Sequence, residues 1–152
     1  MKYKRLVKDI RKKSFPEIKG IILIIKIPFL IPGGGVFWLF PRINILAFST
    51  ACKKLDEKVM IGLIAHELSH FSIFQRGTWF EFLKFLMKIN KKRIIENEKE
   101  TDLLAIEKGY GEELIATKIK AKELLKGTKY EKVFKNHYLT AEEVRKKMKE
   151  KK

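Results

Sequence analysis

The chain has 152 residues, enough for one domain with a modest core and too few for two separate domains. Hydrophobic residues make up 45% and charged residues 34%, which excludes a wholly disordered chain and a fibrous repeat. Lys and Arg outnumber Asp and Glu by 34 to 18, and the formal net charge of +16 makes a polyanion such as nucleic acid the first partner to consider. Part of this charge reflects habitat, since abundant Ile, Lys and Glu beside a single Gln are typical of hyperthermophile proteins.

Two features indicate the cellular location. The single cysteine, Cys52, excludes an internal disulfide and is typical of a reducing compartment. The apolar stretch 20–31 is interrupted by Lys26 and Pro28, is shorter than the roughly 20 residues that a spanning helix needs, and lies too far along the chain for a signal peptide. We therefore expect a cytoplasmic protein, monomeric or dimeric, with peripheral membrane contact left open.

The first part of the chain predicts one helix and three strands. Apolar residues recur at intervals of three and four within residues 1–13, which predicts a short basic amphipathic helix. The Ile-rich run 21–27 is typical of a strand buried on both faces. After a glycine turn, residues 36–40 and 43–48 predict two further strands.

The rest of the chain predicts helices with recognisable ends. Asp56, Thr78 and Thr140 are in N-cap positions, the last two within capping boxes, while Gly109 and Gly127 are stop signals. The expected helices cover about residues 57–74, 79–89, 92–108 and 112–126, with a short basic helix from 141. Three strands followed by helices predict an α+β domain with a small three-stranded sheet.

The most informative residues are His66-Glu67-Leu68-Ser69-His70, an H-E-x-x-H pattern on the first of these later helices. His66 and His70 are four residues apart and project from one face, where two imidazoles can hold one Zn²⁺ ion per chain. Glu67 is then placed to act as general base for a metal-activated water. The segment before the motif is nearly all apolar, so this helix belongs to the core, and buried histidines are costly there unless something satisfies them.

A catalytic zinc needs a third protein ligand. Three glutamates, Glu96, Glu98 and Glu100, lie on the helix over residues 92–108. Histidine ligands usually donate their second N–H to a carboxylate, and Glu98 has Asp102 one turn further along the helix. We therefore choose Glu98 as the ligand and Asp102 as the carboxylate behind a histidine, with Glu96 and Glu100 as alternatives.

The helical H-E-x-x-H followed by E-x-x-x-D on a second helix resembles the gluzincin metallopeptidases. The nearer resemblance is to minigluzincins, soluble versions of the catalytic domains of CAAX-prenyl-protease and heat-shock-protease-X type membrane proteases. It covers about residues 36–110 and implies a zinc-dependent metallopeptidase that hydrolyses peptide or protein substrates. It also implies that the strand before the metal helix is an edge that pairs with an extended substrate. That strand consists of Ile43, Asn44, Ile45, Leu46, Ala47 and Phe48.

Two features depart from the membrane relatives. The interval 71–97 is too short for the pair of spanning helices that they carry there. The helix that it contains is apolar nearly all round, which favours a core helix over a surface that touches lipid or a partner.

No spacing selects the residue that would stabilise the oxyanion. His137 and Tyr138 are the candidates, with Tyr110 and Tyr130 beside them. Peptide deformylase also has an H-E-x-x-H motif, but its ligand cysteine lies in an E-G-C-L-S motif that the sequence around Cys52 does not match. Cys52 is instead predicted to be a small buried hydrophobic residue.

Two other interpretations stay open. One is a basic nucleic-acid or polyanion-binding protein with a structural or non-catalytic metal site, although no nucleic-acid-binding signature accompanies the charge. The other is a gluzincin scaffold that is latent, like a zymogen. The segment 129–152 follows the matched region and contains His137, so it is a candidate for limiting access to the zinc. The alternative for this segment is a terminal helix with a basic tail.

Overall fold

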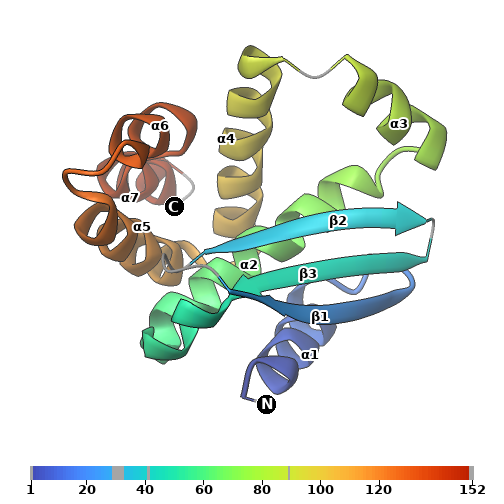
Figure 1. The fold of residues 1–152 in the computed structure, drawn as a ribbon, viewed down its shortest axis with the longest axis horizontal. Coiled ribbons are helices and arrows are strands. Elements are labelled where there is room, and N and C mark those ends of the chain that lie inside the picture. Colours follow the sequence, from blue (N-terminus) through green and yellow to red (C-terminus); the bar gives the residue numbers. More distant parts are fainter. Residues whose placement is uncertain (1, 29–32, 41, 89, 151–152) are drawn as a thin grey trace.

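The structure is a computed structural model that describes residues 2–28, 33–40, 42–88 and 90–150 (Figure 1). Three strands and seven α-helices occupy these residues, so the predicted α+β class with a three-stranded sheet is confirmed. In chain order the elements are α1 (Lys2–Ser14), β1 (Ile21–Ile27), β2 (Gly34–Phe40), β3 (Ile43–Ser49), the 3-10 helix η1 (Thr50–Lys54), α2 (Glu57–Phe74), α3 (Trp79–Met87), α4 (Lys91–Glu107), α5 (Gly111–Leu125), α6 (Tyr130–His137) and α7 (Ala141–Glu150). Some predicted positions lie outside the described residues. They are the helix ends at Met1 and Ile89, residues 29–31 of the apolar stretch, and residues 151–152.

The strand predicted to bind substrate is the central one of the sheet. The strand order is β1-β3-β2, with β1 parallel and β2 antiparallel to β3. The backbone hydrogen-bonding groups of β3 are therefore taken up by neighbours on both sides. The prediction that residues 43–48 form the substrate-binding edge is wrong for this reason, and the free edge beside the metal ligands belongs to β2.

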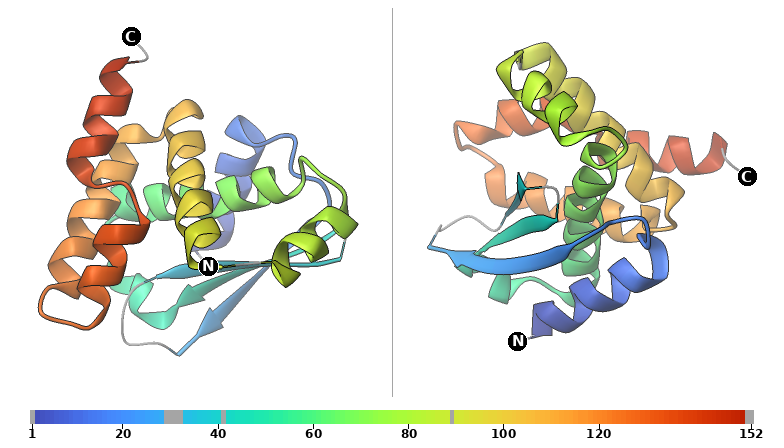
Figure 2. Two further views of the ribbon diagram at one scale, coloured as in Figure 1. Left: turned by 90° about the horizontal axis from the view of Figure 1, so that it is seen from above. Right: turned by 90° about the vertical axis from the view of Figure 1, so that its right-hand side faces the viewer.

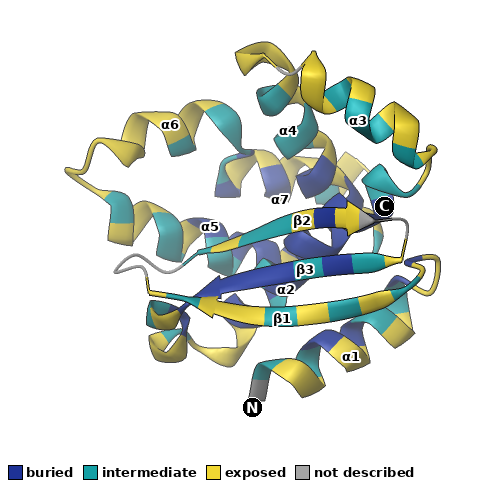
Figure 3. Ribbon diagram, turned by 45° about the vertical axis from the view of Figure 1, so that its right-hand side comes forward, coloured by how far each residue is buried: buried dark blue, intermediate teal, exposed yellow. Residues whose placement is uncertain are grey.

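The outer strand β1 has only one covered face. Ile22 and Ile24 pack against the main core, whereas Ile21, Leu23 and Ile25 are exposed. The prediction of a strand buried on both faces is therefore wrong. The physical reason is that α1 and α2 lie behind one face of the sheet and no described helix covers the other (Figures 2 and 3).

The main core lies between the covered face of the sheet and helices α1 and α2. Ile64 and Leu68 of α2 are fully buried there and belong to the same cluster as Phe48 of β3. Gly62 allows α5 to approach α2 closely, since a Cβ atom at this position would overlap the carbonyl oxygen of Glu113. As α2 is buried along most of its length, the polar motif that it carries is buried too.

A second core joins α4, α5 and α7. Leu114 and Val144 are fully buried in it, together with Leu139 and Ala141 from the end of the chain. The C-terminal segment therefore contributes side chains to the interior of the domain.

The helix ends follow most of the predicted signals. Capping boxes are present at Thr78 and at Thr140, and both Gly109 and Gly127 have positive φ angles where helices end. Asp56 is at the N-cap of α2 but makes no side-chain capping bond. Helix α6 has no counterpart among the predicted elements, because its eight residues begin without a side-chain cap.

Helix α3 lies on the surface, so the prediction of a core helix is wrong. None of its described residues is buried, and the side chains of Phe80 and Met87 are 72% and 78% exposed. Phe82 of this helix contacts Trp38 and Phe74. Among the described helices, none combines the length and the hydropathy that a membrane span requires.

Candidate metal centre

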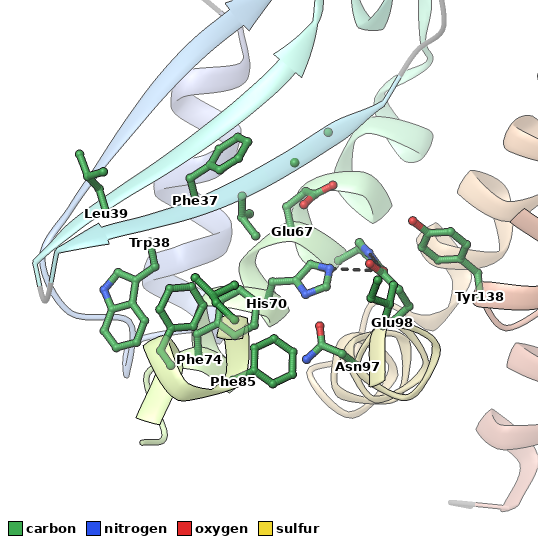
Figure 4. A pocket seen from close by; sticks show the side chains of 17 residues that line it. Phe37, Trp38, Leu39, Glu67, His70, Phe74, Phe85, Asn97, Glu98 and Tyr138 are labelled. Atoms are coloured by element: carbon green, nitrogen blue, oxygen red, sulfur yellow. Dashed lines mark ion pairs between the residues drawn. The ribbon is translucent and has the colours of Figure 1, made fainter. Parts of the chain in front are cut away.

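Two helices bring the three predicted metal ligands together. Helix α2 presents His66 and His70, and α4 brings Glu98 to face both rings (Figure 4). Oε2 of Glu98 lies 3.2 Å from Nε2 of His66 and 3.4 Å from Nε2 of His70. One ligand atom from each of the three residues lies within 4.8 Å of the other two, so this group can hold a metal ion.

The second nitrogen of each ring has its own partner. His66 Nδ1 lies 2.9 Å from Oδ1 of Asp102, which can only accept, so Nδ1 carries the hydrogen. Thr101 donates its hydroxyl hydrogen to the Asn97 carbonyl at 2.8 Å and thus accepts from His70 Nδ1 at 3.1 Å. In the neutral form, both rings therefore direct an Nε2 lone pair towards Glu98.

This arrangement of acceptors fits a cation. Oε2 of Glu98 is buried and has no hydrogen-bond partner among the described residues, although both Nε2 atoms are close to it. A buried carboxylate oxygen of this kind is costly unless a positive charge meets it. Ligand atoms at about 2.0–2.1 Å from a tetrahedral ion lie roughly 3.3 Å from one another, which agrees with the two observed separations.

In the metal-free protein a proton takes the place of that cation. Burial opposes the charged form of His66, but the carboxylates of Asp102 and Glu98 outweigh burial and raise the pKa of His66 to about 9. Burial likewise acts to raise the pKa of Glu98, and the two histidines outweigh it and hold that pKa well below its usual range.

Asp102 lies behind the metal site and is held by three separate parts of the chain. Besides His66, its Oδ1 accepts from Lys118 Nζ at 2.8 Å, and its Oδ2 accepts from the backbone N–H of Leu139 at 3.0 Å. Burial raises the pKa of Asp102, but Lys118 and His66 outweigh burial and lower it. The carboxylate is therefore ionised and fully hydrogen-bonded, which suits a group that orients a histidine ligand.

The other acidic candidates do not reach the site. Glu96 is exposed and forms an ion pair with Lys92, and Glu100 forms one with Arg76. Cys52 is fully buried, as predicted, and its thiol donates to the Gly33 carbonyl.

Glu67 is buried between the metal ligands and the edge strand β2. Its carboxyl lies against the backbone of Gly34, where a Cβ atom would come within 2.5 Å of Oε1. Burial raises the pKa of Glu67, and the nearby histidines act in the opposite direction. A carboxyl that is both hidden from bulk water and adjacent to the ligands is suited to receive a proton there.

Of the four candidates for oxyanion stabilisation, only Tyr138 borders the site. Its ring lies 5.8 Å from that of His66, and its hydroxyl points towards Glu67 and the ligands (Figure 4). His137 lines none of the described pockets. Tyr110 contacts Ser14 through its hydroxyl at 2.9 Å and stacks on Phe15, and Tyr130 is exposed.

Two pockets meet at the ligands. One, of about 450 Å³, lies between β2 and helices α3 and α4, and its walls are mostly aromatic and aliphatic. The other, of about 190 Å³, lies towards α5 and α6. Both are lined by Gly34, His66, Glu67 and Tyr138, so these four residues form the boundary that the two pockets share.

Three supporting residues were missed in the sequence. Thr101 had a local signal, since it lies three residues after Glu98 on the same helical turn as Asp102. Lys118 has no such signal, because nothing in the sequence distinguishes this buried lysine from the other basic residues. The backbone N–H of Leu139 leaves no sequence pattern at all. It belongs to the segment 129–152, which follows the region that the resemblance covers.

Comparisons with protein families, with curated proteins and with solved structures find no match to this chain.

Proposed function

We propose that the chain is a zinc-dependent metallopeptidase in which His66, His70 and Glu98 hold the ion and Glu67 is the general base. The observation that carries this proposal is the convergence of two imidazole nitrogens on Oε2 of Glu98, a buried atom without a hydrogen-bond partner. Two imidazoles and one carboxylate form a ligand set that suits zinc and leaves room for a reacting molecule. When bound, zinc activates water and polarises the carbonyl group of the substrate.

The chain's own groups complete the reaction. Glu67 takes a proton from the attacking water and delivers it to the leaving nitrogen of the peptide. Tyr138 donates a hydrogen bond to the carbonyl oxygen as negative charge develops on it. Burial and the nearby carboxylates raise the pKa of Tyr138, which keeps this hydroxyl protonated and available as a donor.

The substrate in this proposal is a peptide in extended conformation. The edge of β2 that faces away from β3 lies along the larger pocket, so it offers unpaired backbone groups to a substrate strand. Gly34 places the backbone against Glu67, and Trp38 points from the same strand into the pocket (Figure 4). Large apolar side chains of the substrate fit the aromatic wall beyond it.

The test combines metal analysis with cleavage of an unstructured peptide mixture. Glu98→Gln is expected to lose most of the zinc, whereas Glu96→Gln, on the same helix and exposed, keeps it. Glu67→Gln is expected to keep both zinc and fold while losing hydrolysis, because an amide cannot accept the proton. A wild-type protein that holds zinc and cleaves nothing in the mixture would contradict the peptidase activity, and full zinc content in Glu98→Gln would contradict the ligand set.

A further inference from the structure

The uncovered face of the sheet is almost entirely apolar. Side chains alternate between the two faces of a strand, and the residues of β1 and β2 that point away from α1 and α2 are large and hydrophobic. Phe37 is 60% exposed, and Leu23 is 46% exposed. Together with their half-buried neighbours on β3, the side chains of this outer sheet face are Ile21, Leu23, Ile25, Phe37, Leu39, Ile43 and Ile45.

The strand register makes these side chains contiguous. Leu23 is aligned with Ile45, and Ile45 is aligned with Phe37, so one row of apolar side chains crosses all three strands. Phe37 and Leu39 lie on the opposite side of β2 from Trp38 (Figure 4). Seven such side chains form a patch of several hundred Å², which reaches the size at which a patch marks an interaction site.

Basic residues lie near both ends of this face. Between Glu17 and Asp56 the sequence contains no acidic residue. The basic residues of the same interval are Lys19, Lys26, Arg42, Lys53 and Lys54, and all five are exposed. Lys19 and Arg42 lie where β1 and β3 begin, and Lys54 follows the end of β3, whereas Lys26 and Lys53 line a pocket with Glu57 and residues of α1 on the covered side of the sheet.

We propose that the outer sheet face binds to the surface of a membrane that contains anionic lipids. An apolar patch enters the interface between headgroups and acyl chains, and a rim of lysine and arginine adds attraction to anionic headgroups. Nucleic acid does not match an apolar patch. A second copy of the chain is also disfavoured, because it would bring two positive rims together over less than the roughly 800 Å² per partner of a standard interface.

This inference is independent of the peptidase proposal, although the two surfaces share β2. The same strand presents Phe37 and Leu39 to the lipid and lines the pocket at the metal ligands with its edge. A bound protein therefore holds its pocket beside the membrane surface.

The test is sedimentation of the folded protein with vesicles of equal parts phosphatidylglycerol and phosphatidylcholine. We expect binding that weakens with salt and with vesicles of phosphatidylcholine alone. The double variant Leu23→Ser/Phe37→Ser is expected to bind at least tenfold more weakly. The control is Ile119→Ser on α5, an equally exposed apolar residue outside the face, which binds as the wild type does. Circular dichroism and zinc content show whether the variants are folded.

A second pair of variants tests the rim. Lys19→Gln/Arg42→Gln is expected to lose affinity for anionic vesicles, and Lys146→Gln/Lys149→Gln on α7 removes the same charge with little effect. Since these exposed residues contribute nothing to the core, the pair is informative even if the apolar variant does not fold. Three results would overturn the proposal: wild-type protein that stays in solution with anionic vesicles, equal binding by Leu23→Ser/Phe37→Ser, or a stable dimer by light scattering that this variant dissociates.

Discussion

The backbone of Gly34 lies directly against the carboxyl group of Glu67. A Cβ atom built on Gly34 would come within 2.5 Å of Oε1 and 2.9 Å of Cδ, whereas one on the neighbouring Gly35 would meet nothing within 4 Å. The absence of a side chain at position 34 therefore fixes where the carboxyl of Glu67 can lie. The two glycines offer a matched pair of positions for testing its role.

Gly34→Ala is expected to displace Glu67 and to lower kcat at least tenfold, with zinc content unchanged, because the three atoms nearest to a Cβ at position 34 all belong to Glu67. Gly35→Ala should have nearly wild-type activity. Steady-state cleavage of a peptide, with metal analysis of both variants, checks this. Equal turnover by Gly34→Ala would mean that the reaction tolerates a moved carboxyl.

Thr101→Val is expected to weaken zinc affinity about tenfold, since it removes the oxygen that accepts from His70 Nδ1 and leaves the ring free to rotate. Thr117→Val is the control, because Thr117 makes the same hydroxyl bond to the carbonyl four residues earlier, at 2.9 Å, without touching a histidine. Competition with a chelator of known affinity measures both. If the two variants bind zinc equally well, the hydroxyl of Thr101 does not orient His70.

Zinc affinity is expected to fall as the pH falls. Because the pKa of His66 is raised to about 9 in the metal-free protein, its ring is protonated at neutral pH, and zinc must displace that proton. Between about pH 9 and neutrality, each unit of decrease should weaken binding roughly tenfold, with release of one proton per zinc in weakly buffered solution. An affinity that is constant over this range would show that His66 is neutral before the metal binds.

Tyr138→Phe is expected to lower kcat about 100-fold with little change in KM or zinc content, because it removes a donor that acts as charge develops on the carbonyl oxygen. The phenylalanine ring keeps the stacking on Phe134 and the contact with Lys118. His137→Ala, one residue earlier, should leave kcat unchanged. If the two variants behave alike, Tyr138 has no part in the chemistry.

The sequence predicts those parts of the site that are local in the chain. His66, Glu67 and His70 lie close together on one helix, and Glu98 and Asp102 lie close together on another. Spacing alone therefore places the members of each group side by side. Lys118 and Leu139 reach Asp102 across 16 and 37 residues, and contacts of that separation leave no periodic signal. The order of strands in the sheet also depends on contacts between distant residues. The sequence therefore does not show that β3 is the central strand and not an edge.

Burial was predicted less well than element type. An Ile-rich strand has the same sequence pattern whether helices cover both of its faces or only one. In β1 one face is exposed. Helix α3 is apolar nearly all round, yet none of its described residues is buried, and it contacts Phe74 and Trp38 through Phe82. In both cases the apolar sequence predicts a surface that avoids water. It does not show whether another part of this chain buries that surface.

The segment 129–152 cannot be removed as a simple test of access to the site. Leu139 and Val144 lie in the second core, so deletion from residue 129 would remove buried apolar surface as well as Tyr138. A limiting role for this segment stays a prediction, and point variants at its surface address it better than truncation.

The hydrogen bonds of Asp102 join groups that leave the ribosome at different times. During synthesis, His66, His70 and Glu98 leave the ribosome before Lys118 and well before Leu139, yet the carboxylate behind His66 needs both of the later groups. A nascent chain therefore carries all three ligands without the support that keeps them in place. A metal ion held by this group would therefore be retained tightly only after the last third of the polypeptide has docked.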